Sequence, residues 1–228
     1  LVLDFTITDS DQLLYTTSDT DGVLGPSYDI EGRVSRTIFS VPFRQAVVEW
    51  GNHSEATHYV LPKPTRALEG YLYKIEKGTL GRMPVSGYGL TTQNDDSLTL
   101  FTKANTDQYN LSIYDNQSGV STEVSTFFFP EKCTISTAKI MYCGNDERIV
   151  NDRAFPDNWY RGEVSYADNI WSLNLQTLQS NFLLNTLEVS GRELDIVDVS
   201  LSNDEFSLYF KNKNDHTLWV YDVISSGN

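Results

Sequence analysis

Two segments near opposite ends of the chain share one pattern, and this repetition narrows the possible folds. Residues Asp4–Tyr15 read DFTITDSDQLLY, and residues Asp198–Tyr209 read DVSLSNDEFSLY. They lie 194 positions apart and match without a gap in apolar, hydroxyl and acidic character at most positions. Alternating apolar and polar residues predict half-buried strands, and the Asp, Ser and Asn residues between them predict hairpin turns. The chain therefore carries copies of an antiparallel unit.

A third strand, Leu218–Tyr221, follows the second copy, and its pattern recurs along the chain. Equivalent positions are Tyr73, Ile113, Leu173 and Val220, spaced by 40, 60 and 47 residues. Self-similarity at roughly 40–50 residues, with four short strands per unit, is typical of a β-propeller. We therefore predict an all-β propeller of four-stranded antiparallel blades, with about five blades in a single domain covering 1–228. The expected blades are about 4–40, 45–83, 87–128, 131–185 and 194–225.

The ends of the chain bear on the size of the ring. The fifth unit stops just after its third strand, and Leu1–Leu3 directly precedes the first strand of unit one. Propellers commonly close by completing one blade from both termini. We therefore favour a piece of a larger propeller of about six to eight blades over a complete five-bladed ring.

Charge and hydropathy exclude several classes of function. The net charge is −14, from 17 basic and 31 acidic side chains, and no cluster of Lys and Arg is present. Binding to nucleic acid or to an anionic membrane surface needs such a cluster, so we expect neither. No apolar run reaches the roughly 18 residues that span a bilayer. The chain begins with Leu1, so a membrane anchor or leader would lie outside these residues.

The two cysteines flank a predicted hairpin with its turn at Thr137–Lys139. This turn places Cys133 directly opposite Cys143. Opposed Cβ atoms on antiparallel strands lie roughly 4.5–5.5 Å apart, close to disulfide geometry. We predict a disulfide formed in an oxidising compartment. The alternative is a pair of buried, reduced thiols.

A long insertion at Gly144–Asn169 separates two strands of the fourth unit. In a four-stranded blade, the loop between the second and third strands opens on the same face as the connection between blades. Functional residues concentrate on such loops, so this face is the expected working face. Trp159 and Tyr160, with Asp157 and Arg161, could form an aromatic and polar platform for a protein or glycan. The alternative is that Trp159 packs onto the blade and holds the loop, while the polar residues satisfy backbone groups.

Other chemistry has weaker support. Asp19–Gly22 resembles the start of a calcium loop, but the downstream bidentate Glu is missing, so Ca²⁺ is only weakly indicated. No metal site is expected, because His53, His58 and His216 do not stand at ligand spacing from the cysteines. Five-bladed glycoside hydrolases use two or three acidic residues around the channel mouth. The available carboxylates are Asp4, Glu49, Asp157, Asp168 and Asp198.

Two groups of residues resemble known propellers. Ser202–Asp204, followed by Leu208–Phe210 and Leu218–Asp222, resembles the repeat of TolB-like and WD-repeat-like propellers, although the Ser/Asp turn is not evident in unit two. Two longer segments, 131–143 and 156–171, are similar to uncharacterised propellers of candidate-phylum (Parcubacteria-type) bacteria, which often carry an N-terminal membrane anchor. That resemblance implies a propeller in the cell envelope and supplies no catalytic residue.

From these observations we expect a non-catalytic binding or scaffold module, located outside the cell or in its envelope. Its partner would be a protein or a glycan at the loop face. The alternative is a five-bladed carbohydrate-active hydrolase with its carboxylates at the channel mouth. A third possibility is a propeller that gates an attached catalytic domain.

Overall fold

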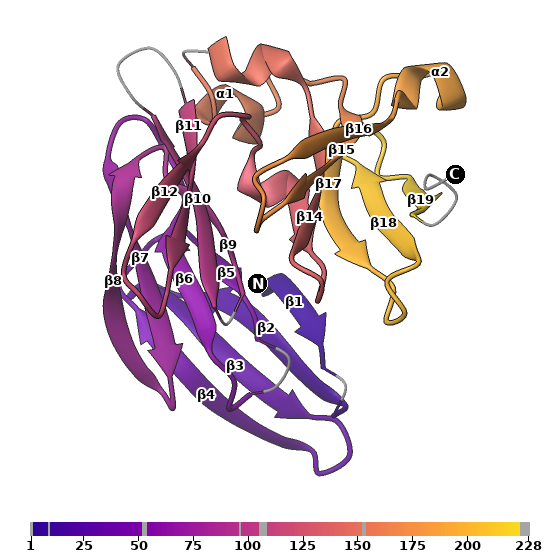
Figure 1. Cartoon of the computed structure of the whole chain (residues 1–228). Coiled ribbons are helices and arrows are strands. Elements are labelled where there is room, and N and C mark those ends of the chain that lie inside the picture. The colour runs from indigo at the N-terminus through magenta and orange to yellow at the C-terminus, as the bar shows by residue number, and fades with distance from the viewer. Residues whose placement is uncertain are drawn as a thin grey trace. The chain divides into compact units, whose positions relative to one another are not determined.

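The structure is a computed structural model that describes residues 2–8, 10–51, 54–95, 97–104, 109–151 and 154–223, with backbone alone at 150 and 151. Contacts within the chain divide it into two compact units, Leu1–Leu90 and Thr91–Asn228. Every sheet is an antiparallel meander of consecutive strands (Figure 1). Such meanders form where alternating apolar residues are separated by short polar turns, as in this chain.

The first unit contains two four-stranded sheets. The first sheet is formed by β1 (Val2–Ile7), β2 (Gln12–Ser18), β3 (Val23–Asp29) and β4 (Val34–Val41). The second is formed by β5 (Ala46–Glu49), β6 (His58–Pro62), β7 (Glu69–Glu76) and β8 (Thr79–Tyr88). Apolar residues that alternate along these strands, such as Val23, Val60 and Ile75, are buried in a common core.

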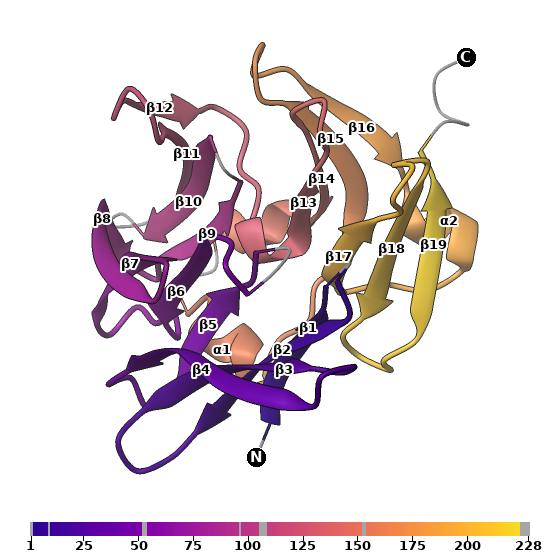
Figure 2. The ribbon, with the colours of Figure 1, turned by 90° about the horizontal axis from the view of Figure 1, so that it is seen from below.

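The second unit contains two four-stranded sheets and one three-stranded sheet. The third sheet is β9 (Thr91–Asn94), β10 (Leu98–Ala104), β11 (Tyr109–Asp115) and β12 (Ser121–Val124). The fourth is β13 (Cys133–Ile135), β14 (Ile140–Asn145), β15 (Asn169–Asn174) and β16 (Ser180–Leu184). The fifth is β17 (Ile196–Leu201), β18 (Ser207–Asn212) and β19 (Leu218–Asp222) (Figure 2).

The described helices are all short. They are the 3₁₀ turns η1 (Pro130–Lys132) and η2 (Glu147–Asn151), and the α-helices α1 (Asp157–Tyr160) and α2 (Thr186–Ser190). In the described ranges, none of them has the length and hydropathy needed to cross a membrane. The prediction of an all-β propeller with about five blades is confirmed.

The repeat between the two ends of the chain is a structural repeat. β17 begins and ends 194 positions after β1, the offset found in the sequence. The turn residues Asp11 (φ 53°) and Glu205 (φ 59°) are also 194 apart, and both adopt the left-handed conformation that is uncommon for residues other than glycine. Leu14 and Leu208, at the same offset, are both buried. The repeated sequence therefore produces the same hairpin in both units.

The predicted disulfide is present in the fourth sheet. Cys133 and Cys143 are direct partners in the β13–β14 ladder, their Cα atoms are 4.1 Å apart, and their sulfur atoms are bonded. Both residues are buried in an apolar cluster that includes Met141 and Leu173. The register predicted from the turn is confirmed.

Two measurements test the disulfide. A thiol assay on denatured, non-reduced protein is expected to find no free thiol, whereas the same protein after reduction should show two. The double substitution Cys133→Ala/Cys143→Ala should lower the free energy of unfolding by about 3 kcal/mol, because the bond closes a short loop in the unfolded chain. Two free thiols without reduction would contradict the bond.

Candidate functional site

The connection between β14 and β15 is the long insertion of the fourth sheet, and a single carboxylate closes its base. Asp146 accepts hydrogen bonds from the backbone N–H groups of Arg148 (2.9 Å) and Ala167 (2.8 Å), and from the Arg148 guanidinium. Burial opposes ionisation of Asp146, but these hydrogen bonds outweigh it and lower its pKa. Because Ala167 lies at the end of the loop and Arg148 near its start, Asp146 holds the two ends together.

Beneath this loop lies a small aromatic core. Phe129, Phe155, Trp159 and Tyr166 are all buried, together with Tyr109 from β11. The Phe129 and Phe155 rings meet edge to face with centroids 4.5 Å apart, and Trp159 meets Phe129 at 5.6 Å in the same manner. Edge-to-face pairs add stabilisation beyond the apolar area they bury. The loop is therefore packed onto its own core.

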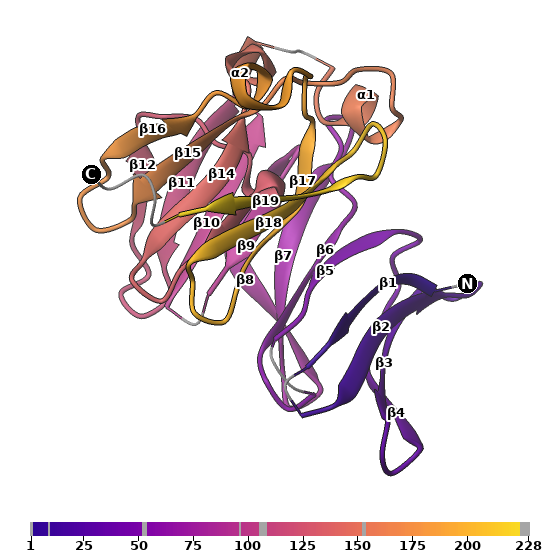
Figure 3. The ribbon, with the colours of Figure 1, turned by 90° about the vertical axis from the view of Figure 1, so that its right-hand side faces the viewer.

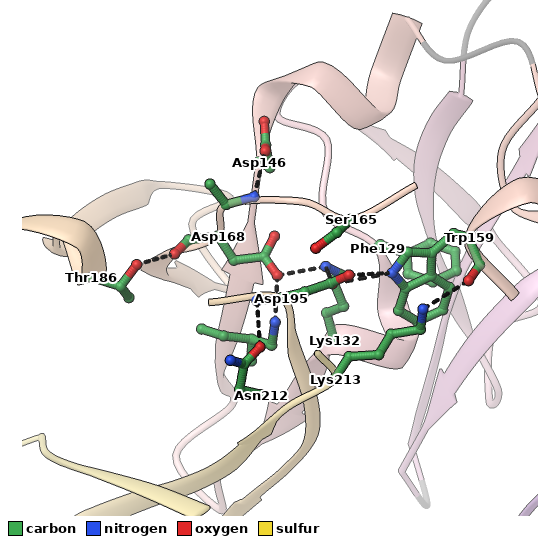
Figure 4. Close-up of polar contacts among 12 residues, drawn as sticks. Phe129, Lys132, Asp146, Trp159, Ser165, Asp168, Thr186, Asp195, Asn212 and Lys213 are labelled. Carbon is green, nitrogen blue, oxygen red and sulfur yellow. Dashed lines mark hydrogen bonds and ion pairs between the residues drawn. The ribbon is translucent and has the colours of Figure 1, made fainter. Parts of the chain in front are cut away.

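A buried cluster of three charges lies beside the aromatic core (Figure 4). The Lys132 ammonium contacts Asp168 at 2.5 Å and Asp195 at 2.6 Å, and all three side chains are fully buried. The indole N–H of Trp159 donates to Asp195 at 2.9 Å, and the backbone N–H of Ile196 donates to Asp168 at 2.7 Å. We call Lys132, Asp168 and Asp195 the ion triad. It joins η1, the end of the loop and the start of β17.

The ion triad carries more negative than positive charge. Burial raises the pKa of Asp168 to about 6, against the opposing effect of Lys132. Its Oδ1 atom is buried and has no hydrogen-bond partner. A proton bound to Asp168 would neutralise the excess negative charge of the ion triad. We assign that proton to Oδ1, because this atom has no other hydrogen-bond partner.

The variant Asp168→Asn tests this assignment. The folded pKa of Asp168 exceeds the unfolded value near 4, so its favourable contribution is complete below about pH 4 and is lost as the pH rises to about 6. The Asn side chain does not ionise, so the variant does not lose stability in this way as the pH rises. Urea denaturation at pH 4.5 and 7.5 gives the unfolding free energies of both proteins. The variant minus wild-type difference should be more favourable to the variant at pH 7.5 than at pH 4.5. The expected shift is on the order of 1–3 kcal/mol, and a difference independent of pH would contradict the assignment.

The turn between β18 and β19 packs against the loop. The Lys213 ammonium donates to the Trp159 carbonyl oxygen at 2.8 Å and lies 4.9 Å from the centroid of the Trp159 indole. Ser165 and Asn214 are joined by a hydrogen bond of 3.0 Å. These contacts fix the outer part of the loop to the fifth sheet.

The side chains that remain exposed on this assembly are polar or charged. Arg161 and Glu163 form an ion pair at 2.6 Å, with 56% of each side chain exposed. Arg148 is 61% exposed, although it also bonds to Asp146. We define the ledge as this exposed set: Arg148, Arg161, Glu163, Ser165 and Asn214.

The four residues predicted to bind a ligand divide between interior and surface. Trp159 is only 3% exposed, so its ring is packed as in the alternative interpretation and is not a surface platform. Tyr160 is half-buried and bonds to Glu131; burial and that carboxylate raise the pKa of Tyr160 well above its usual value. Asp157 is half-buried, and Arg161 is exposed on the ledge. A binding role stays a prediction, and Arg161 is the member best placed for it.

The candidate channel carboxylates have separate surroundings. Asp168 is sealed in the ion triad, and Asp198 is exposed and paired with Lys211 at 2.9 Å. Asp157 is half-buried on α1. In the first unit, Asp4 is exposed on β1 and Glu49 is half-buried on β5. Asp168, whose pKa is raised, is thus a carboxylate that solvent does not reach.

The proposed calcium loop is a compact turn. Asp19 accepts hydrogen bonds from the backbone N–H groups of Asp21 (2.8 Å) and Gly22 (3.0 Å), as expected for a loop tip. Among the described residues, no three or more His, Cys, Asp or Glu side chains are grouped to hold a metal ion.

A hollow of the described surface lies in the first unit. It has a volume of about 560 Å³ and is lined by Glu55, Thr57, Lys74, Glu76, Lys77, Thr79 and Gly81. Lys74 and Glu76 pair with each other at 2.6 Å. Its lining contains no aromatic side chain, so we give it less weight than the ledge.

Comparison with solved structures shows the fold. TolB from Acinetobacter baumannii is similar with a TM-score of 0.64 and 14% identity, over 97% of this chain and 52% of TolB. A chain of a nidogen/laminin complex is similar with a TM-score of 0.61 and 9% identity, over 99% of this chain and 77% of that chain. The β-propeller domain of the Trilobed protease from Pyrococcus furiosus is similar with a TM-score of 0.57 and 8% identity, over 97% of this chain and 67% of that domain.

The chain thus has a TolB-like β-propeller fold and spans about half the length of TolB. No protein-family model matches the sequence, and no curated protein matches it either. At these identities the likeness is one of fold alone.

Proposed function

We propose that this protein is a non-catalytic binding module that uses the ledge to bind another protein. The observation that carries the proposal is the contrast between the two sides of the β14–β15 loop. Its inner side is held by the aromatic core and by the bond from Trp159 to Asp195, while Arg161 and Glu163 stay more than half exposed. A loop that is already ordered loses little conformational entropy when it binds, which favours affinity.

The chemistry of the ledge supports a protein partner over a glycan. The ledge offers charges of both signs and hydrogen-bonding groups, which give specificity in protein recognition. Sugar binding often relies on an exposed aromatic ring, but Trp159 is buried and donates its indole N–H to Asp195. The TolB-like fold and the likeness to a nidogen/laminin complex fit a binding role.

We also propose a location outside the cytoplasm, in the cell envelope or beyond it. The buried disulfide supports an oxidising compartment, since cytosolic thiols are kept reduced. The TolB-like fold fits the same location.

Paired charge substitutions test the ledge. Arg161→Ala/Glu163→Ala removes one exposed ion pair, and Lys74→Ala/Glu76→Ala removes another in the first unit, so the net charge change is the same. Wild type and both variants would be screened against a displayed-peptide library and a glycan array. Binding of the selected peptides should fall at least about tenfold in the ledge variant alone, with unchanged thermal unfolding.

Other outcomes are equally informative. Equal binding by all three proteins would place the binding surface elsewhere and overturn the ledge. Selection of glycans without peptides would overturn the protein partner. If the wild-type protein hydrolyses glycans of the array and Asp157→Asn or Asp198→Asn abolishes that hydrolysis, the hydrolase alternative is favoured.

A further inference from the structure

The third and fourth sheets are neighbours in the second unit (Figure 3), and they share one apolar core. A groove with a volume of about 370 Å³ opens on the described surface beside this core. Its apolar lining consists of Leu98, Ile113, Val120, Leu175 and Leu178. All of these except Val120 belong to the core or pack against it. We call this hollow the inter-sheet groove, and it exposes apolar surface from both sheets.

Two turns of the same geometry border the inter-sheet groove. One connects β11 to β12 and begins at Asp115, and the other connects β15 to β16 and begins at Asn174. The N–H of Gly119 donates to the Asp115 carbonyl oxygen at 2.9 Å, and the N–H of Leu178 donates to that of Asn174 at 2.8 Å. The Oδ1 atoms of Asp115 and Asn174 each accept two more backbone N–H groups, at 2.8–3.0 Å. The two turns therefore match position by position.

Leu178 occupies a turn position that favours glycine. Its φ is 59°, and the matching residue of the other turn is Gly119, with φ 72°. The left-handed backbone conformation is uncommon for a bulky side chain and costs free energy, whereas glycine adopts it readily. The fourth-sheet turn therefore carries a leucine that its own geometry disfavours. That leucine lines the inter-sheet groove.

Asp115 carries a charge that its turn does not require. Asn174 accepts the same pair of backbone hydrogen bonds with a neutral amide. The backbone N–H groups of Ser118 and Gln117 lower the pKa of Asp115, so its side chain is ionised at neutral pH. This carboxylate also lines the inter-sheet groove. Each turn thus adds one group that its geometry does not need, an apolar side chain in one and a negative charge in the other, and both groups line the same groove.

We propose that the inter-sheet groove binds a small amphiphilic amine, with its apolar chain against Leu178 and Ile113 and its ammonium group at Asp115. The volume of the groove is within the range of small-molecule sites, which are mostly apolar with a few polar groups that fix the orientation of the ligand. None of its lining residues belongs to the ledge, and the inference does not depend on the proposed function.

Charge complementarity decides between a cationic and an anionic ligand. Among the described residues that line the groove, Asp115 is the one that carries a charge. The chain as a whole has a net charge of −14, which attracts cations and repels anions. A fatty acid of the same length would bring its carboxylate toward Asp115, so its binding is disfavoured.

The probes are octylammonium and octanoate, which have equal chain length and opposite charge. Each would be titrated into isotopically labelled protein at neutral pH and low ionic strength, because salt screens an exposed ion pair. Octylammonium should cause saturable shifts of the backbone amide signals of Val120, Thr122 and Gln176. It should bind at least about fivefold more tightly than octanoate.

Leu178→Gly tests the apolar wall. It should weaken octylammonium binding about tenfold, while relief of the left-handed leucine keeps the thermal unfolding temperature close to that of wild type. His216→Gly is the matched control. His216 has φ 59°, and its N–H donates to the Asn212 carbonyl oxygen at 2.8 Å, in a turn that does not line the groove. This control should leave binding unchanged.

Asp115→Asn tests the charge, and Asn174 shows that an amide can make the hydrogen bonds of this turn. The variant should lose most of the preference for octylammonium over octanoate. Asp204→Asn removes a carboxylate that accepts a backbone N–H in a turn of the fifth sheet, and it should keep the preference. If Leu178→Gly perturbs the fold, Val120→Lys serves instead, with Val189→Lys as its control, because both valines are more than half exposed and Val120 alone lines the groove.

Four results would overturn the proposal. The first is an absence of saturable shifts with octylammonium, and the second is octanoate binding as tightly as octylammonium. The third is a steep fall in the unfolding temperature of Leu178→Gly with unchanged binding, which would assign Leu178 to packing alone. The fourth is binding of a capped Leu-Lys-Leu peptide without binding of octylammonium, which would indicate a protein partner.

Discussion

Lys132→Met is expected to destabilise the second unit by about 3–5 kcal/mol, enough to unfold a marginally stable protein at room temperature. The substitution leaves Asp168 and Asp195 buried without the cation that both contact. Attraction to Lys132 offsets much of the cost of removing two carboxylates from water. Without it, one or both must bind a proton or the cluster must open. Urea denaturation followed by circular dichroism measures the loss.

Two controls separate this explanation from a simple packing defect. The triple variant Lys132→Met/Asp168→Asn/Asp195→Asn contains no buried charge and should recover much of the lost stability. Lys211→Met removes the cation from an exposed ion pair with Asp198 and should cost less than about 1 kcal/mol. Equal destabilisation by Lys132→Met and the triple variant would show that packing, not charge, dominates.

Trp159→Ala is expected to cost about 3–5 kcal/mol, because it empties the centre of the aromatic core under the loop. The indole contacts Phe129 and Phe155, and its N–H bonds to Asp195. Trp159→Phe keeps most of the aromatic volume but removes the donor, so its cost should be smaller. Urea denaturation gives the free energies, and amide exchange of residues 154–166 reports whether the loop stays ordered.

Trp219→Ala provides a comparison, because Trp219 is a half-buried tryptophan on β19 outside this core. It should cost clearly less than Trp159→Ala. A Trp159→Ala variant that lost less than about 1 kcal/mol and kept its amide protection would show that Trp159 does not hold the loop. The residue would then be better explained by a binding role.

The blade pattern could be predicted because its signals are local. Period-2 alternation, turn residues and the repeated segment determine strand positions over a few residues each. The pairing of Cys133 with Cys143 was predictable for the same reason, since a short turn sets the register of a hairpin. These predictions required no knowledge of distant contacts.

The site was less predictable because it depends on contacts between distant segments. Lys132 meets Asp168 and Asp195 across 36 and 63 residues, and no local sequence pattern predicts that these three side chains come together. Trp159 was recognised as important, but its sequence neighbours could not show whether it pointed inward or outward. The partner that settles its orientation, Asp195, lies 36 residues away.

The closure at Asp146 makes the β14–β15 loop a natural place to graft new sequence. Both ends of the loop bond to one carboxylate, so the distance that a replacement must span is set before any new residue is chosen. A library that varies Gly162–Ser165 while keeping Asp146, Trp159 and Ala167 would change the displayed surface and leave the sheet and its supporting contacts in place. New binding surfaces could therefore be engineered at Gly162–Ser165 without changing the residues that stabilise the loop.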